Sequence, residues 1–544
     1  MRIREWLALV VTLTVISVPA RADEHSEHAH FGDMGQVGKV HFPTSCSPRV
    51  QPQFERAVAM LHSFWYPEAE KSFQSIAQAD RQCSMAWWGV AMTLWHPLWP
   101  ETPDAESLKR GLAAVHQAQA VMGNTARERD YIAAVGAFYE NYDRVDHHAR
   151  ALAYEKAMEK VARRYPDDRE ASIFYSLALL TTASPTDKTY ANQKRASEIL
   201  EKISAAQPDH PGVAHYIIHS YDNPVLAPQG LTAARRYAEI APSVPHALHM
   251  PSHIFVRLGL WQEAITSNLA SAAAARDYEV KVHMNGAWQE RLHALDYLAY
   301  SYLQTGQESE ARRVVEEAGS ATTANPTSFV SEYALAAIPA RFAIERQDWA
   351  AAAALKPRSA SAAAEAITWW ARALGAARTR NVEAAKEDLA QIQVMKDKLD
   401  ASAVPTAKYW AGQVEIQRRA AAAWLAHARQ QDDEAAQLMR SAADMEESIE
   451  KSPVTPGPVV PARELLADLL MEMKQPALAL AEFEASLKSS PNRLHAVYGA
   501  AQAAEAAKQA DVAKRYYAKV VEICSGCSAD EPRLRRAQQF LTKE

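Results

Sequence analysis

Small and aromatic residues recur along the chain at a spacing of about 34 residues. Ala479 and Phe483 near the C-terminus are followed by Pro491, and Ala513 and Tyr517 stand one repeat length after the first two. The same pattern is found at Ala69 and Phe73, Trp87 and Ala91, Leu258, Gly259 and Ala264, and Gly306, Ala311 and Ala318. A repeat of this length forms a helix–turn–helix unit that buries its apolar face only by stacking on its neighbours. The pattern therefore predicts an all-α solenoid over residues 49–544.

These are the small, aromatic and turn positions of the tetratricopeptide repeat (TPR) pattern, and Pro208 and Pro242 close two central units one repeat length apart. The chain resembles the TPR family over roughly residues 49–544. The resemblance implies a TPR-like helix–turn–helix superhelix with a short irregular segment before it. It also implies a concave groove in which a peptide, protein or small-molecule ligand binds.

Composition divides the chain into segments. A His-rich segment spans residues 23–48, and the TPR-like array spans residues 49–451. Pro453, Pro456 and Pro458 exclude a helix from residues 452–460, which are predicted to form a Pro-rich linker. Residues 461–544 are predicted to form a C-terminal TPR pair and tail.

The overall composition agrees with a folded helical protein. Apolar residues make up 48% of the chain and charged residues 23%, and only 18 of 544 residues are Gly. The net charge of −6 excludes a generally basic surface, so no nucleic-acid partner is expected.

The N-terminus has the pattern of a signal peptide. Arg2 and Arg4 precede an apolar run over residues 6–18, which is shorter than the roughly 20 residues that span a bilayer. The small residues Ala20 and Ala22 favour cleavage after Ala22, so residues 1–22 are predicted to be removed. We expect a periplasmic or secreted protein with no membrane span after signal removal; the alternative is an N-terminal membrane anchor.

Cleavage after Ala22 places a histidine third in the mature chain. His25 then lies where its imidazole, the terminal amine and two backbone amides bind Cu(II) or Ni(II) in a square plane. His28 and His30 add further ligands. The alternative is a solvated polar tail.

A second group of histidines follows the repeat itself. His215 and His219 stand one repeat length before His249 and His253, and each pair is spaced i, i+4, which places both imidazoles on one helix face. His246 extends the second pair. In the next unit the equivalent positions hold His293, Asp296 and Tyr300. In the TPR family such positions line the concave groove.

These residue types in this pattern favour a metal site. Histidines at i, i+4 grip one ion, and several imidazoles with a carboxylate suit a divalent transition metal such as Zn, Cu or Fe. The predicted ligands are His215, His219, His246, His249, His253, His293 and Asp296. The alternative is a metal-free groove that binds a carboxylate- or phosphate-bearing ligand, in which Tyr300, Asp222, Arg257 and Arg341 take part.

Two further features accompany the histidine repeat. His62 and His96 are one repeat length apart among aromatic residues that form either a core or an aromatic wall across the groove from the histidines. Cys46 and Cys83 are predicted to form a disulfide in an oxidising compartment, and Cys524 and Cys527 a local one.

Three strings resemble those of a group of exported bacterial TPR proteins: residues 246–255 read HALHMPSHIF, residues 42–48 read FPTSCSP and residues 83–89 read CSMAWWG. This resemblance implies the fold and export but no reaction. Two functional hypotheses follow. The chain is an exported scaffold that binds a ligand in its groove through the His/Asp cluster, or it is a metal-dependent enzyme, a hydrolase or an oxidoreductase.

Overall fold

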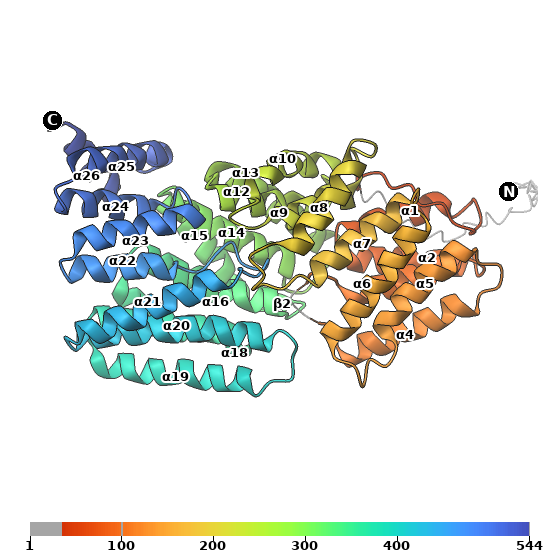
Figure 1. Ribbon diagram of the computed structural model, residues 1–544, viewed down its shortest axis with the longest axis horizontal. Coiled ribbons are helices and arrows are strands. Elements are labelled where there is room, and N and C mark those ends of the chain that lie inside the picture. Colours follow the sequence, from red (N-terminus) through yellow and green to blue (C-terminus); the bar gives the residue numbers. More distant parts are fainter. Residues whose placement is uncertain (1–34, 100–101, 543–544) are drawn as a thin grey trace, which may run out of the picture. The chain divides into compact units, whose positions relative to one another are not determined.

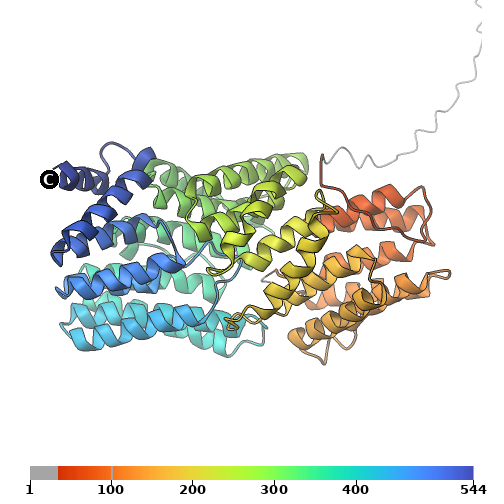
Figure 2. The same cartoon turned by 45° about the horizontal axis from the view of Figure 1, so that its top comes forward.

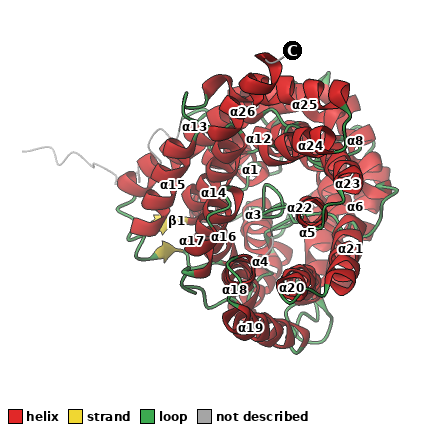
Figure 3. Ribbon diagram, turned by 90° about the vertical axis from the view of Figure 1, so that its left-hand side faces the viewer, coloured by secondary structure: helices red, strands yellow, loops and turns green. Residues whose placement is uncertain are grey.

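The computed structural model describes residues 35–99 and 102–542. The predicted signal peptide and the predicted N-terminal metal ligands His25, His28 and His30 lie outside these residues. Helices joined by loops make up most of the described chain, and its strands are one short parallel pair, β1 (Ala287–Trp288) and β2 (Ala324–Asn325) (Figure 3). No helix among the described residues is long and apolar enough to cross a membrane.

The described residues begin with an irregular segment at 35–50, and the helix pairs follow it. The N-terminal helices are α1 (Gln51–His62), α2 (Tyr66–Ala79), α3 (Ser84–Trp95), α4 (Ala105–Ala120), α5 (Ala126–Tyr139), α6 (His147–Arg164), α7 (Arg169–Thr181) and α8 (Ala191–Ser204). The central helices are α9 (Pro211–Tyr221), the short 3-10 helix η1 (Ala227–Gly230), α10 (Leu231–Ile240), α11 (Pro245–His249), α12 (Pro251–Leu258), α13 (Trp261–Lys281), α14 (Gln289–Gln304) and α15 (Glu308–Ser320).

The remaining helices complete the array. They are α16 (Phe329–Glu345), α17 (Trp349–Ala353), α18 (Ala362–Arg378), α19 (Val382–Asp400), α20 (Ala407–Ala428), α21 (Asp432–Ser448), α22 (Ala462–Glu472), α23 (Pro476–Ser489), α24 (Leu494–Ala506), α25 (Ala510–Ile523), η2 (Cys524–Gly526) and α26 (Pro532–Thr542). Most helices pack on the helices one or two places away in the sequence, as Figures 1 and 2 show from two sides. The predicted all-α, TPR-like solenoid is confirmed.

The repeated small and aromatic residues explain how the helix pairs close. Phe73 of α2 lies against Gly89 of α3, and Phe483 of α23 lies against Gly499 of α24 in the same way. A Cβ atom at either glycine would collide with the phenyl ring. Glycine is therefore required where these helices approach one another, at both ends of the array.

The two cysteine pairs form disulfides. The Cys46–Cys83 bond joins the irregular segment before α1 to the start of α3, across a separation of 37 residues. The Cys524–Cys527 bond closes the turn after α25.

The segment at 452–460 is irregular, as its prolines indicate, but it is not an exposed linker. Val454, Val459 and Val460 are buried. Arg341 of α16 donates hydrogen bonds to the carbonyl oxygens of Gly457, at 2.9 Å, and Pro458, at 2.7 Å. The prolines mark a break between helices here, but the helices before and after it pack together. The segment does not separate them, because it runs through the interior beside α14 and α16.

Candidate functional site

Six histidines gather where four central helices meet. They come from α9, α11, α12 and α14 and form two groups in which the nitrogen atoms available as ligands lie within 4.8 Å of one another. We name these groups by their members: the first group is His215, His219 and His246, and the second is His249, His253 and His293. The two groups are neighbours, since the rings of His219 and His253 are 5.7 Å apart.

Local helix geometry positions these side chains. His215 and His219 lie one turn apart on α9, which begins at Pro211. Pro251 has no N–H for the preceding turn, so α11 ends at His249 and α12 begins at Pro251. The two rings of the second pair, at His249 and His253, are thus on either side of a break between helices.

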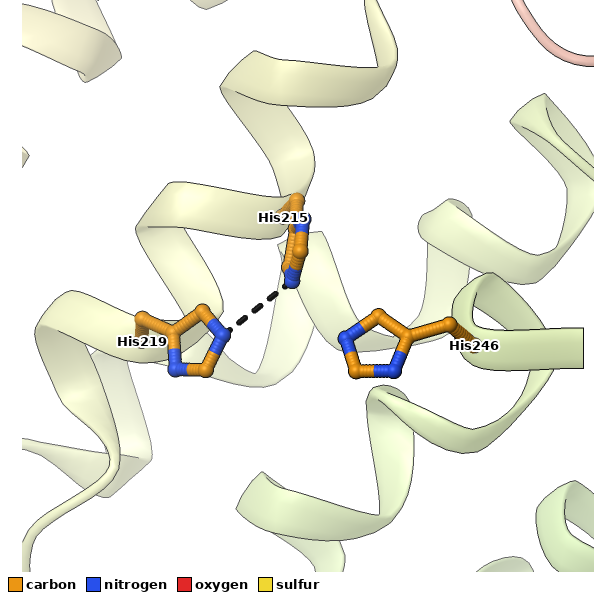
Figure 4. Close-up of side chains that lie close together, drawn as sticks. All are labelled: His215, His219 and His246. Atoms are coloured by element: carbon orange, nitrogen blue, oxygen red, sulfur yellow. Dashed lines mark hydrogen bonds between the residues drawn. The ribbon is translucent and has the colours of Figure 1, made fainter. Parts of the chain in front are cut away.

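Figure 4 shows the first group, with its three rings directed toward a common space. The Nε2 atoms of His215 and His219 are 3.1 Å apart. The Nδ1–H of His215 donates to the carbonyl oxygen of His62 at 2.7 Å, so its Nε2 carries a lone pair. His246 lies 3.3 Å through Nδ1 from a carboxylate oxygen of Glu290, and its buried Nε2 has no hydrogen-bond partner among the described residues.

In the second group, neighbouring side chains determine which ring nitrogen of His249 and of His253 carries hydrogen. The Asn268 amide donates to the carbonyl oxygen of Ala264, which turns its own oxygen toward the Nδ1–H of His249 at 2.7 Å. His253 donates its Nδ1–H to Asp222 at 2.9 Å. The two Nε2 atoms, 3.1 Å apart, are therefore both lone-pair acceptors when the rings are neutral.

Burial favours the neutral form of five of these histidines. It lowers the pKa of His215, His219, His249 and His293 well below the ordinary value of 6.5. It lowers the pKa of His253 to about 4, although Asp222 opposes the shift. Neutral imidazoles are the form that binds metal ions.

Two lone pairs that face each other at 3.1 Å have no hydrogen between them to share. A bound cation resolves this arrangement. Two nitrogens on one tetrahedral Zn²⁺ ion, each about 2.0–2.1 Å from it, are about 3.3 Å apart. The spacing of His249 and His253 therefore fits two ligands of one ion, and the hydrogen bonds behind them are of the kind that orient metal-binding histidines.

The other predicted site residues lie behind or beside the histidines. Asp296 belongs to neither group, because its carboxylate is held by the buried Arg341 at 2.8 Å. Asp222 supports His253 from behind and also accepts hydrogen bonds from Arg257 at 2.8 Å and Lys451 at 2.9 Å.

Tyr300 packs against Trp261 and under the guanidinium groups of Arg341 and Arg493 rather than at the histidines. Sequence alignment of the repeats thus places Tyr300 and Asp296 near the cluster, but neither offers an atom to it. Both belong to the packing that holds residues 455–458 in place.

Aromatic side chains surround the two groups. The ring of Phe64 lies 4.4 Å from His215 and that of Trp99 lies 5.7 Å from His246. Tyr297, which sequence reasoning missed, lies 4.5 Å from His249 and brings its hydroxyl to 3.5 Å from Nε2 of His253. It follows His293 by four residues on α14, so the i, i+4 rule applied once more would have found it.

A third buried group, His62, Glu170 and His210, has a different role. Glu170 joins both imidazoles, at 2.9 Å and 2.7 Å, and His62 also contacts the hydroxyl of Tyr216 at 2.9 Å. The ring nitrogens of both histidines are thus engaged. This network fixes the part of α1 whose carbonyl group orients His215.

The repeat positions predicted that the six histidines line an open groove. The structure differs from this prediction. All except His219 are at least nine-tenths buried, beneath Pro453 and Val454 of the segment that runs through the interior. A small cavity remains between the groups, lined by His219, His246, His253 and His293 and by Phe64, Leu98, Trp99, Val330, Pro453 and Val454. Both groups thus face one enclosed space.

The fold and the site together define an all-α repeat protein with two neighbouring three-histidine groups in its interior. No family model matches the chain, and no curated protein matches it.

Several solved structures align over most of the chain. A monomeric mutant of IFIT1 with m7Gppp-AAAA is 12% identical with a TM-score of 0.34, covering 81% of this chain and 90% of that one. The APC/C hetero-tetramer Cut9–Hcn1 is 12% identical with a TM-score of 0.31, covering 91% and 95%. The P58(IPK) TPR domain is 13% identical with a TM-score of 0.21, covering 91% and 99%. These scores are low, so the TPR-like fold rests on the chain's own helix pairs.

Proposed function

We propose that the two histidine groups hold a pair of transition-metal ions and that the chain is an exported, metal-dependent enzyme built on a helical-repeat scaffold. The observation that carries this proposal is the pair of Nε2 lone pairs of His249 and His253, opposed at 3.1 Å with both Nδ1–H groups donating elsewhere. The unpartnered Nε2 of His246 in the first group supports it.

Copper is the ion that the donor set favours. All six ligands are imidazoles, which suit Zn, Cu and Fe, and neither group includes a carboxylate or a thiolate. Sites of non-haem iron in oxygenases usually include a carboxylate, and for a given nitrogen site the affinity of divalent ions is greatest for Cu²⁺.

The number of ligands favours catalysis over a structural role. Structural zinc sites are closed by four protein ligands, whereas catalytic sites have three and keep one position open. Here each ion has three protein ligands, and both groups face the same small cavity. The nearby carboxylates Asp222 and Asp296 are both bound by arginine, and Glu290 faces Nδ1 of His246 at 3.3 Å, so each of the three is engaged and none stands ready as the general base of a hydrolase. An oxidoreductase is therefore the better-supported class.

The test is the metal content of untagged, full-length protein. We expect copper in both histidine groups of the wild type, two ions per chain beyond any that the N-terminal histidines His25, His28 and His30 bind. His215→Ala and His249→Ala, one from each group, should each lower the content and reduce the thermal stabilisation by metal. That stabilisation amounts to about 4 kcal/mol when free metal is in thousandfold excess over Kd.

His116→Ala is the matched control, because His116 is exposed on α4 and should change neither quantity. His249→Gln serves if the alanine variant does not fold. A wild-type protein that purifies without metal and whose melting does not respond to Cu, Zn or Fe would contradict the proposal. So would a His249 variant that keeps as many ions as the wild type.

A further inference from the structure

A second, larger cavity lies beside the small one. Its volume is about 350 Å³, within the range of small-molecule binding sites. The two cavities have Leu98, Trp99, His219 and Pro453 in common among their lining residues. His219 is also the least buried of the six histidines. The larger cavity therefore adjoins the first histidine group at His219.

A buried lysine stands at the wall of the larger cavity. The side chain of Lys451 is more than nine-tenths buried, and its ammonium donates to a carboxylate oxygen of Asp222 at 2.9 Å. Both residues line the cavity. An ammonium group has three N–H donors, and the bond to Asp222 uses one of them. No other acceptor bonds this ammonium among the described residues, so its remaining donors are available to a ligand.

The two carboxylates of the same wall are each held by two cations. Asp222 binds Lys451 and Arg257. Glu450 binds Lys188 at 2.7 Å and Arg257 at 3.5 Å. Neither carboxylate is left to receive a cationic ligand, and three cationic side chains stand against two carboxylates in this network. The excess of positive charge attracts an anion, and cations bound by the histidine groups would add to it.

The histidines of the wall do not reverse this balance. Burial lowers the pKa of His96 and of His147 to about 4 and that of His219 well below 6.5, so these rings are neutral at pH 7. The fourth, His148, is exposed. Burial lowers the pKa of Lys451 only to about 8, so most of its ammonium is charged at pH 7.

The remaining wall suits an organic molecule better than an inorganic ion. Leu98, Trp99, Leu180 and Pro405 contribute apolar side chains to it. Such surface gains free energy when it covers an apolar body, which an inorganic anion lacks. A carboxylate attached to an apolar body satisfies both the charge and the surface of this cavity.

We infer that the larger cavity is the substrate site of the metal pair and takes a small organic molecule that carries a carboxylate. The carboxylate pairs with the ammonium of Lys451, the apolar body packs on Trp99, and the molecule lies beside His219. This inference rests on the proposed function, because the metal pair is what the cavity would serve.

The experiment measures the binding of benzoate and benzamide to the copper-loaded, full-length protein by calorimetry. The two molecules have the same ring and a similar size, but only benzoate carries a charge. We expect benzoate to bind at least about tenfold more tightly and to change the visible absorption of the bound copper, because it lies beside His219. Inorganic phosphate, which has no apolar body, should bind more weakly than benzoate.

Lys451→Met should remove the preference for benzoate and leave the affinity for benzamide unchanged. Lys188→Met is the matched control, because it removes a cation from the same network, but Lys188 does not line the cavity. This variant should keep most of the preference. The comparison of benzoate with benzamide uses the wild type, so it decides the question even if Lys451→Met does not fold.

The copper content of each protein is measured first. Lys451 and the cavity wall do not depend on the ions, so a wild type that holds no copper but prefers benzoate contradicts the proposed function and leaves a carboxylate site without a metal pair. The inference itself is overturned if benzamide or phosphate binds as tightly as benzoate, if benzoate leaves the absorption of bound copper unchanged, or if the two lysine variants behave alike.

Discussion

At the scale of single residues, the site depends on which ring nitrogen of each histidine carries hydrogen. Asn268 decides this for His249 because its amide nitrogen is committed to Ala264 and only its oxygen faces the ring. Asp222 does the same for His253. Without these acceptors each neutral ring could place its hydrogen on Nε2, and that atom could then no longer bind a metal ion.

We therefore predict that Asn268→Leu weakens metal binding without removing a ligand. The expected loss is about 10–100-fold in affinity, the usual effect of removing a hydrogen bond behind a metal-binding histidine. Competition against a chelator of known affinity measures it. Asn124→Leu is the control, since that buried amide bonds the carbonyl oxygen of Ala118 far from the site in sequence. Equal affinities for the two variants would show that Asn268 does not orient the ligand.

At the scale of elements, the irregular segment at 452–460 determines how the site is enclosed. Arg341 on α16 holds it through Thr455, Gly457 and Pro458 while remaining paired with Asp296. The guanidinium is fully buried and uses its donors on one carboxylate and three oxygens of the segment. Tyr297 also donates to the carbonyl oxygen of Pro453 and Tyr333 to Thr455, so Arg341 makes the most bonds to the cover over the histidines but not all of them.

Replacing Arg341 alone should lower the free energy of unfolding far more than replacing Arg341 and Asp296 together. We predict that Arg341→Met lowers the free energy of unfolding by about 3–5 kcal/mol, because it leaves the Asp296 carboxylate buried and unpaired. Arg341→Met combined with Asp296→Leu should recover a large part of that loss. Urea unfolding of the single and double variants measures both values. Additive losses would contradict the pairing.

The sequence predicts the elements better than it predicts this arrangement. The repeat pattern correctly indicates the helix pairs, and the aligned positions correctly bring six histidines together. Asp296 occupies an equivalent position but is taken by Arg341, 45 residues further along the chain. The contact between Arg341 and Gly457 spans 116 residues. No repeat pattern records such contacts, so the burial of the site beneath residues 453 and 454 could not be predicted.

At the scale of the described chain, the C-terminal repeats are joined to the central ones by direct contacts. The indole of Trp261 donates to the carbonyl oxygen of Asn492 at 2.8 Å. Arg493 is fully buried between Glu345 and Glu464. Residues 461–544 therefore do not form a separate domain, although the stack still consists of units that contact mainly their neighbours.

Such a stack opens locally, and metal binding should change only some of its openings. Hydrogen exchange occurs through openings whose free energies differ along a repeat protein. An opening that breaks coordination becomes more costly by about 4 kcal/mol at thousandfold excess of metal, which slows exchange about a thousandfold. We expect this protection in α9, α11, α12, α14 and residues 452–460. Hydrogen-exchange mass spectrometry with and without copper measures it.

The control helix is α19, which packs on α18 and α20 and carries none of the ligands. Its exchange should be the same with and without copper, because its openings leave the coordination intact. Equal protection of α19 and α9 would indicate that the described chain unfolds only as a whole. Unchanged exchange in α9 would mean that His215 and His219 hold no ion. Protection confined to the ligand-bearing helices and the segment above them would show that coordination joins three neighbouring repeats across the break at Pro251.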